Sequence, residues 1–288
     1  MAYLTVRHRT VYRYTEPVGL GEHRMMFRPR ESHDLRLIRT SLAITPEPVQ
    51  LRWLHDPFDN SVAVAAFQGT TRELCFESTV TLEHFESAVP EYPIEDQAKT
   101  YPFRYSDEDF ANLAPGLANH YPSSQTSSWA LQFLDDAATT GTMKILRRMT
   151  RGIRDQFTYA RRTEKGVQSP EETIRTRRGS CRDFAVLMME AARSLAIAAR
   201  FVSGYIYVPN DSDGVGGGNT HAWMQAYLPG AGWIDFDPTN SIVGNRNLIR
   251  VGVAWSPEQV MPLCGTYEGS VEAFAGMDVS VTVIEAAG

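Results

Sequence analysis

Apolar and polar residues follow two different rhythms along this 288-residue chain, and the change between them divides it. Up to about residue 82 the apolar positions recur every second residue, as in YLTVRHRTVYRY at residues 3–14. This alternation predicts strands with one buried face. Further strands, bounded by Pro, Gly, Asp and Asn, are predicted at Leu35–Ile44, Val49–His55, Ser61–Phe67 and Glu73–Leu82. Repeated short strands of this kind indicate an antiparallel β-sandwich or a small barrel, and we expect the sandwich.

The rhythm then changes to the spacing of a helix. Residues 89–124 form a weakly periodic connector in which we expect one short helix at Asp107–Leu113. Helices are predicted at Ser127–Leu134 and Thr142–Phe157, and a shorter one begins at Ser169-Pro170 and ends at Thr176. Strands rich in β-branched and aromatic residues follow from residue 199. We therefore expect three regions: a β-domain at 1–88, the connector, and an α+β domain at 125–288.

One helix of the α+β region carries a reactive residue at its start. In GSCRDFAVLMMEAARSL, Ser180 is suited to cap the helix, Asp183 lies at the capping-box position, and Cys181 is the first helical residue. The apolar residues Phe184, Met188, Ala191 and Leu195 predict one buried face. Free N–H groups and the helix dipole favour a thiolate at Cys181, although a lone cysteine is more often a small buried apolar residue.

Two further residues complete a possible catalytic set. The run NTHAWMQAYLPGAGWIDFDPTN places His221 at the start of one predicted strand and Asp237 at the end of the next. A nucleophile, a base and a carboxylate that orients the base are the components of a thiol acyl-transfer site. The backbone N–H of Cys181 is a natural oxyanion donor, and Tyr159 is a candidate for a second one.

The turn between these strands decides whether His221 and Asp237 can meet. A two-residue loop would put them on opposite faces, because a slip of one residue reverses every side chain. We therefore predict a loop of odd length or a bulge. Asp235 shares the face of Asp237, so strand periodicity does not separate the two acids.

RGSCRDFA together with HAWMQAYLPGAGWIDFDPTN resembles the bacterial transglutaminase-like superfamily, over roughly residues 125–245. The resemblance implies a papain-like core with a Cys-His-Asp triad, which falls here on Cys181, His221 and Asp237. VRHRT and VYRYTEPVGLGEHRMMFRPR resemble the N-terminal β-domain that precedes this core in many relatives. AWSPEQVMPLCG departs from the family pattern at Trp255 and Ser256, which puts substrate preference in question.

The resemblance implies a cysteine-dependent enzyme that acts on amide bonds of peptides or proteins through a thioester, and we favour hydrolysis. The alternatives are a protein-glutamine transamidase, a thiol acyltransferase like the arylamine N-acetyltransferases, and a non-catalytic scaffold. Trp223 and Trp233 are candidates for the substrate cleft, with core packing as the competing reading because a tryptophan buries a large area.

Composition limits the classes of molecule that this protein is expected to bind. The net charge of −6, from 28 basic and 34 acidic residues, favours neither nucleic acid nor an anionic membrane. We find no apolar run that predicts a signal peptide or a membrane span, and three cysteines without a CxxC pair fit a reducing cytoplasm. We expect no cofactor and a peptide or protein as substrate, and the oligomeric state is left open.

The remaining motifs favour no separate site. The loop NDSDGVGGGNT lacks the helix that a phosphate loop needs and the ligands that an EF-hand needs, so we expect a rim beside the active site and no metal. Five histidines are scattered through the β-region and are expected to be ordinary residues: His8, His23, His33, His55 and His84.

Overall fold

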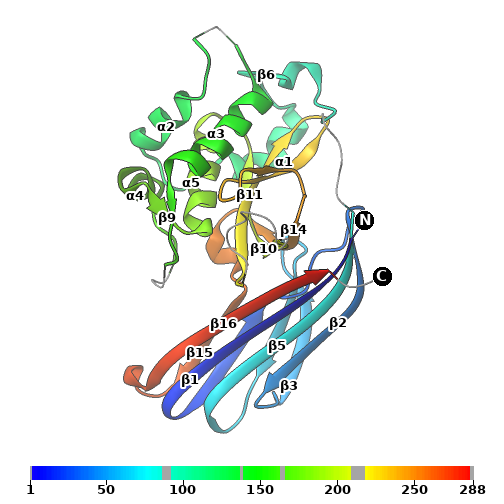
Figure 1. The fold of residues 1–288 in the computed structure, drawn as a ribbon, viewed down its shortest axis with the longest axis vertical. Helices are drawn as coiled ribbons and strands as arrows, with labels where there is room; N and C mark the ends of the chain where they lie inside the picture. Colours follow the sequence, from blue (N-terminus) through cyan, green and yellow to red (C-terminus); the bar gives the residue numbers. More distant parts are fainter. Residues whose placement is uncertain (1, 86–91, 137–138, 163–165, 209–217, 286–288) are drawn as a thin grey trace.

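The computed structural model describes residues 2–85, 92–136, 139–162, 166–208 and 218–285, and it confirms the predicted α+β architecture. Helices gather around a small sheet at one end of the molecule, and long strands form the other end (Figure 1). Most of the glycine-rich loop in which we expect a rim beside the active site, residues 209–217, lies outside the described residues.

The N-terminal region is a seven-stranded antiparallel sheet. Its strands are β1 Ala2–Met25, β2 Leu35–Thr45, β3 Gln50–His55, β4 Ser61–Ala66, β5 Thr70–His84, β15 Leu263–Glu268 and β16 Phe274–Glu285. The first half of β1 pairs with β5 and β16, whereas its second half pairs with β4 and β15. The single long strand β1 thus belongs to both layers of the sandwich.

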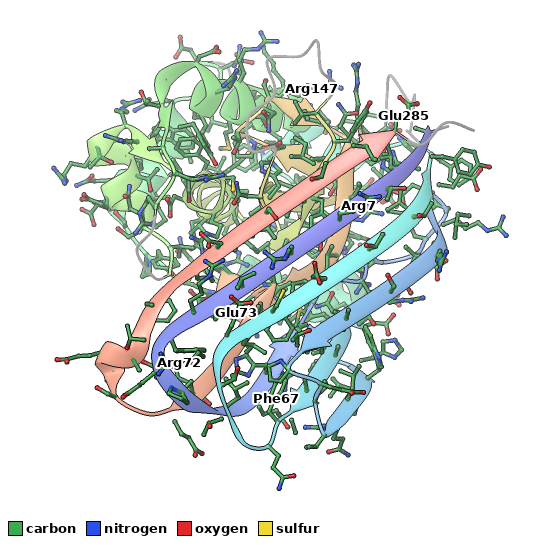
Figure 2. The ribbon with its side chains drawn as sticks, turned by 60° about the horizontal axis from the view of Figure 1, so that its bottom comes forward. Arg7, Phe67, Arg72, Glu73, Arg147 and Glu285 are labelled. Carbon is green, nitrogen blue, oxygen red and sulfur yellow. The ribbon has the colours of Figure 1, made fainter. Side chains whose placement is uncertain are left out.

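Strands β15 and β16 come from the end of the chain, although the expected division placed residues 125–288 in one domain. Figure 2 shows β16 lying beside β1, with Arg7 projecting from β1. The pairing runs from Leu4 with Glu285 to Tyr14 with Phe274. The last strands carry weak local signals, and their place in the sheet depends on these long-range pairs, which periodicity does not encode.

The α+β region combines a five-stranded sheet with helices. The sheet has the order β13-β12-β11-β10-β14, with β10 Ala199–Ile206, β11 His221–Leu228, β12 Gly232–Asp237, β13 Ile242–Val243 and β14 Leu248–Ala254. The helices are α1 Asp107–Leu117, α2 Ser124–Leu131, α3 Thr142–Gln156, α4 Pro170–Thr176 and α5 Cys181–Ser194. Short elements complete it: β6 Thr100–Tyr101, β7 Thr140–Gly141, β8 Thr158–Tyr159, β9 Arg178–Gly179, and the 3-10 helices η1 Asp96–Ala98, η2 Pro257–Val260 and η3 Val271–Ala273.

Helix α5 lies at the centre of this region and is buried on nearly every side. It packs against β10 and β11 on one side and against α2, α3 and α4 on the other. The predicted face of Phe184, Met188, Ala191 and Leu195 is buried, and burial extends beyond it to Glu190 and Arg193. Arg193 donates to Glu190 at 2.6 Å and to three backbone carbonyls, so these buried charges are paired and hydrogen-bonded.

The two regions share a buried interface along β10 and β14. Nδ1 of His8 lies 3.0 Å from the Tyr205 hydroxyl, and Nε2 of His84 lies 3.1 Å from the carbonyl of Leu248. Asn60, which is fully buried, exchanges two hydrogen bonds with the backbone of Val253. None of the helices in the described part of the chain has the length and apolar character that crossing a membrane requires.

Candidate active site

The start of α5 is fixed by Asp183. Its carboxylate accepts the backbone N–H and the hydroxyl of Ser180, both at 2.8 Å, so the predicted capping box is confirmed. Its other oxygen accepts from Nη1 of Arg162 at 2.8 Å and from the backbone of Gln168 at 2.7 Å. Arg162 thus forms an ion pair with Asp183. The helix entry that holds Cys181 is therefore tied to the chain before α4.

A second contact supports the same segment. Strands β8 and β9 pair in parallel, so that Tyr159 lies beside Gly179, two residues before Cys181. Tyr159 is half-buried, and its pKa is raised mainly by burial and then by the nearby charge of Cys181. The structure thus brings the candidate oxyanion donor close to the sulfur.

The hairpin of β11 and β12 has the register that the chemistry requires. Leu228 pairs with Gly232, which leaves a three-residue loop of Pro229, Gly230 and Ala231. The predicted odd loop is confirmed. Gln225 therefore lies opposite Asp235, and the odd-numbered residues of both strands share one face.

His221 and Asp237 form a buried pair at the ends of these strands. Nε2 of His221 lies 2.8 Å from Oδ2 of Asp237, and both side chains are fully inaccessible. Burial lowers the pKa of His221, but the charge and hydrogen bond of Asp237, with a smaller effect of Cys181, raise it to about 10. Burial likewise raises the pKa of Asp237, but His221, Asn240 and the N–H of Thr239 outweigh burial and lower it. The geometry favours an imidazolium–carboxylate pair.

The sequence reasoning missed the groups that hold Asp237. The backbone N–H of Thr239 donates to its Oδ1 at 2.9 Å, and Nδ2 of Asn240 donates to its Oδ2 at 2.8 Å. An aspartate that accepts from residues two and three positions later is the usual Asx turn, so DPTN carried the signal. These donors fix the carboxylate that faces His221.

The rival acid has other partners. Oδ1 of Asp235 accepts from Nε1 of Trp223 at 2.6 Å and from Nε2 of Gln225 at 2.8 Å, and its Oδ2 accepts from Arg250 at 3.1 Å. Asp237 is the acid that His221 contacts.

Cys181, at the start of α5, lies near this pair. It lies close enough for its thiol to contribute to the raised pKa of His221. Nδ1 of His221 is buried and makes no hydrogen bond of ordinary geometry within the described residues. Cys181 keeps 7% of its surface exposed, compared with 1% for His221 and 0% for Asp237.

The tryptophans divide between core and surface. Trp223 is fully buried and its ring stacks on His221 with centroids 5.9 Å apart, so it offers no face to a substrate. The core-packing reading therefore holds for Trp223. Trp233 is partly exposed and contacts Trp255. The guanidinium carbon of Arg200 lies over the Trp233 ring, 4.1 Å from the ring centroid. Four residues separate Trp233 from Asp237, which is about 13 Å along a strand. The divergent Trp255 therefore lies at the far end of β12 from the cluster.

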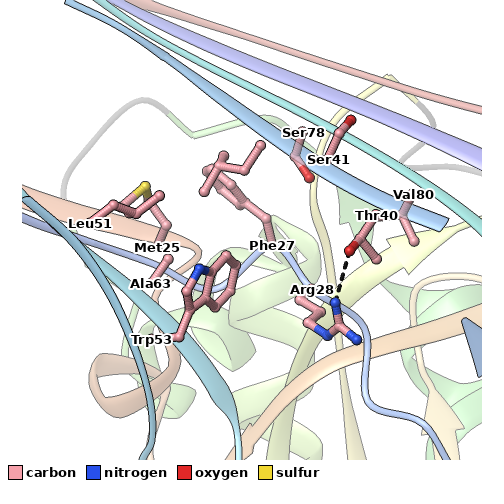
Figure 3. Close-up of a pocket in the computed structure, with 11 residues that line it drawn as sticks. Met25, Phe27, Arg28, Thr40, Ser41, Leu51, Trp53, Ala63, Ser78 and Val80 are labelled. Atoms are coloured by element: carbon pink, nitrogen blue, oxygen red, sulfur yellow. Dashed lines mark hydrogen bonds between the residues drawn. The ribbon is translucent and has the colours of Figure 1, made fainter. Parts of the chain in front are cut away.

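A cavity of about 200 Å³ lies elsewhere, inside the N-terminal sandwich (Figure 3). Its lining includes Phe27 and Trp53, with Arg28 hydrogen-bonded to Thr40. Its lining residues all belong to the N-terminal region, so it is not a cleft of the cysteine cluster. Within the described ranges, no three His, Cys, Asp or Glu side chains gather as a metal site would require.

Two family models match the chain. Residues 4–83 match the bacterial transglutaminase-like N-terminal region, and residues 129–238 match the transglutaminase-like superfamily core. The second match spans Cys181, His221 and Asp237.

Relatives and a solved structure extend the likeness to the whole chain. Protein ML0607 of Mycobacterium leprae is 37% identical over 122 residues, which is 41% of this chain and 43% of that protein. Protein Rv2569c of Mycobacterium tuberculosis is 26% identical over 294 residues, 97% of this chain and 91% of that protein. A crystal structure described as a "Putative Cysteine Protease" from Cytophaga hutchinsonii has a TM-score of 0.71 at 21% identity, covering 100% of this chain and 92% of that one. This last likeness shows a shared fold.

Proposed function

We propose, from the premise that this chain belongs to the transglutaminase-like superfamily, that it is a cysteine-dependent hydrolase of peptide or protein amide bonds. The observation that carries the proposal is the buried His221–Asp237 pair, whose second ring nitrogen makes no ordinary hydrogen bond to any described residue and whose neighbour is Cys181 at a helix N-terminus. A buried histidine held by a carboxylate beside a thiol is the arrangement that activates a sulfur nucleophile.

In the resting enzyme the thiol proton of Cys181 has already moved to Nδ1 of His221, so the cycle begins from a thiolate beside an imidazolium. The thiolate attacks the amide carbonyl carbon, and the carbonyl electrons move to oxygen, where the backbone N–H of Cys181 and the hydroxyl of Tyr159 donate to the oxyanion. His221 then gives its proton to the leaving amine as the C–N bond breaks, which leaves a thioester. Water attacks the thioester, His221 takes the water proton, and the acid is released as the thiolate leaves. Asp237 holds Nε2–H and stabilises the imidazolium throughout.

The choice of hydrolysis rests on water as the default acceptor. In the same chemistry an amine acceptor would give transamidation, and an acetyl thioester donor would give acetyl transfer. We keep hydrolysis of peptides or proteins in the cytoplasm, without a cofactor, as the proposal.

A labelling experiment on the intact chain tests it. Iodoacetamide near neutral pH should modify Cys181 faster than Cys75 or Cys264, with mass spectrometry to assign each site. The variant Cys181→Ala should lose labelling at this position and all turnover while it keeps the wild-type melting temperature, and Cys264→Ala should keep both.

The substrate is identified by incubating the protein with a peptide library and a labelled amine. Cleavage without amine incorporation supports the hydrolase, and incorporation alone shows a transamidase instead. Turnover of acetyl-CoA in place of either would show an acetyltransferase. A folded wild type whose Cys181 resists iodoacetamide and that gives no product is a scaffold, and a Cys181→Ala variant that unfolds supports a structural cysteine.

A further inference from the structure

Asp34 is an acidic residue of the N-terminal region whose carboxylate bonds across the interface between the two regions. Both its oxygens accept from Nη2 of Arg250 on β14, at 2.6 and 2.7 Å, and Nδ2 of Asn245 and the hydroxyl of Ser32 also donate to it. Burial raises the pKa of Asp34, but the charge and hydrogen bonds of Arg250, with those of Ser32 and Asn245, lower it to about 2. Asp34 is therefore a charged partner of the core sheet.

Arg250 connects this carboxylate to a second one. Its Nη1 donates to Oδ2 of Asp235 on β12 at 3.1 Å. The side chain of Arg250 is 16% exposed, and those of Asp34 and Asp235 are 10% and 5% exposed. Because such a cluster has little access to water, removing one charge leaves the others poorly compensated. One guanidinium thus joins the two regions of the chain.

Asp235 is linked to the candidate base His221 through Trp223. Its Oδ1 accepts from the indole Nε1 of Trp223 at 2.6 Å, and the Trp223 ring stacks on His221 at an interplanar angle of 28°. Gly204 makes room for this ring, since a Cβ there would lie 2.8 Å from Cη2 of Trp223. The indole therefore has one defined position, set on one side by Gly204 and on the other by Asp235.

We propose that Asp34 and Arg250 are positioning residues, through which the N-terminal region holds the His221 ring in the plane that serves Cys181. The inference rests on the proposed function, because it assigns His221 a catalytic task. The route is Asp34 to Arg250, Arg250 to Asp235, Asp235 to the indole of Trp223, and the indole to the imidazole. The N-terminal region is thereby part of the machinery that orients the base, in addition to covering the core sheet.

The test uses the full chain and the alkylation rate of Cys181 as a function of pH. Asp34→Asn keeps the shape but removes the charge that holds Arg250. We expect its alkylation rate to fall roughly three- to thirtyfold and the pH profile to shift, as expected when a coupled network is weakened at one member. Glu22→Gln is the matched control, since it breaks the exposed Glu22–Arg52 ion pair of the same region and should leave both readouts unchanged.

Two further variants distinguish positioning from general stability. Trp223→Phe keeps a ring beside His221 but loses the bond to Asp235, so it should reproduce the effect of Asp34→Asn. Combining the two should add little, because both interrupt one route. Arg250→Lys keeps the positive charge but cannot donate to Asp34 and Asp235 at the same time. This variant replaces Asp34→Asn in the test if Asp34→Asn does not fold.

The inference is overturned if Asp34→Asn, or Arg250→Lys in its place, lowers the melting temperature but leaves the rate and pH profile within twofold of wild type. Fully additive effects of Asp34→Asn and Trp223→Phe overturn it as well. Failure of the proposed function looks different, because the wild type itself then shows no preferential labelling of Cys181.

Discussion

Two buried histidines, one in each region of the molecule, show how the same side chain acquires opposite character. His8 in the N-terminal sheet is 3% exposed, and His221 in the core sheet is 1% exposed. Burial lowers the pKa of His8 to about 4, whereas the pKa of His221 is raised to about 10. His8 has the hydroxyls of Tyr205 and Thr10 as partners, and His221 has the carboxylate of Asp237.

The difference lies in the partner and not in the depth of burial. Desolvation disfavours the charged ring at both places, and only a nearby negative charge reverses its effect. His8 is therefore a neutral structural residue at the interface, and His221 is a cation held near Cys181. A search for functional histidines in a fold of this kind should begin with carboxylates at hydrogen-bond distance.

The variant Asp237→Asn should make His221 resemble His8. With the carboxylate gone, burial still lowers the pKa of His221 and only the smaller effect of Cys181 still raises it, so this pKa should fall and the ion pair with Cys181 should weaken. We expect the alkylation and turnover rates near neutral pH to fall on the order of 10²- to 10⁴-fold, as when the acid of a catalytic triad becomes an amide.

Asp235→Asn sharpens this comparison. It removes the rival acid on the same strand face, which acts on His221 only through Trp223, so its effect should be the smaller of the two. Equal losses in both variants would contradict the assignment of Asp237 as the orienting acid. Alkylation by iodoacetamide is quenched at set times, and mass spectrometry measures the modified fraction of each cysteine. Cys75 and Cys264 serve as internal references.

The sequence predicts those parts of the site that depend on neighbouring residues, and it does not predict those that depend on contacts between distant strands. The helix entry at Cys181, its capping box of Ser180 and Asp183, and the odd turn of the hairpin follow from local spacing, and the structure has each of them. Periodicity alone leaves Asp235 and Asp237 equivalent, because both lie on one face. Their separate partners, Arg250 and His221, come from different strands, which only the folded sheet brings together.

The stability of Asp237→Asn should also depend on pH. The raised pKa of His221 gives stability that is complete below 6.5 and is lost as the pH rises through about 10. The lowered pKa of Asp237 gives stability that is present above 3.8 and is lost as the pH falls through its folded value. The stability gap to wild type is therefore widest between pH 3.8 and 6.5.

Denaturant unfolding from pH 6 to pH 10 measures the gap. It should narrow toward pH 10, by at most about 1.4 kcal/mol per pH unit, which is the limit for one proton. A gap that stays constant over this range would mean that His221 is not charged in the folded wild type.

His8 should give the opposite dependence on pH. Its folded pKa lies below the unfolded value, so the unfolded chain binds the proton more readily and stability is lost as the pH falls from 6.5 through about 4. A shift of this size corresponds to about 3 kcal/mol. The variant His8→Gln should lack this acid-induced loss, which urea unfolding of both proteins between pH 4 and 7 would detect as a difference in slope.

The interface around His8 shows what the sequence could not provide. Its histidine was one of five without a distinguishing motif, and its partner Tyr205 lies 197 positions away. Asp34 and Arg250 are likewise separated by 216 positions. The strands of the first region were predicted from alternation and those of the second from their β-branched and aromatic residues. The contacts between the two sheets depend on docking, for which a single sequence holds no periodic signal.

The smallest effect concerns the contact between β16 and the residues that lead into β11. The N–H of Val281 donates to the carbonyl of Gly218 at 3.0 Å, three residues before His221. Because this N–H points away from β1, Val281→Pro removes it without removing a ladder bond. A hydrogen bond of this kind contributes about 0.5–1.5 kcal/mol, so we expect Cys181 labelling to slow only a few-fold.

Val279→Pro is the matched control. Its N–H points to the same side of β16, two residues away, and makes no hydrogen bond to any described residue. Both substitutions place a proline in an edge strand, at a position whose backbone N–H points away from the neighbouring strand β1. Proline is tolerated at such positions. If only Val281→Pro slows labelling, the end of the chain helps to place the strand that carries His221. If both variants slow labelling equally, the effect belongs to strand β16 as a whole. The hydrogen bond between Val281 and Gly218 then has no separate role in placing His221.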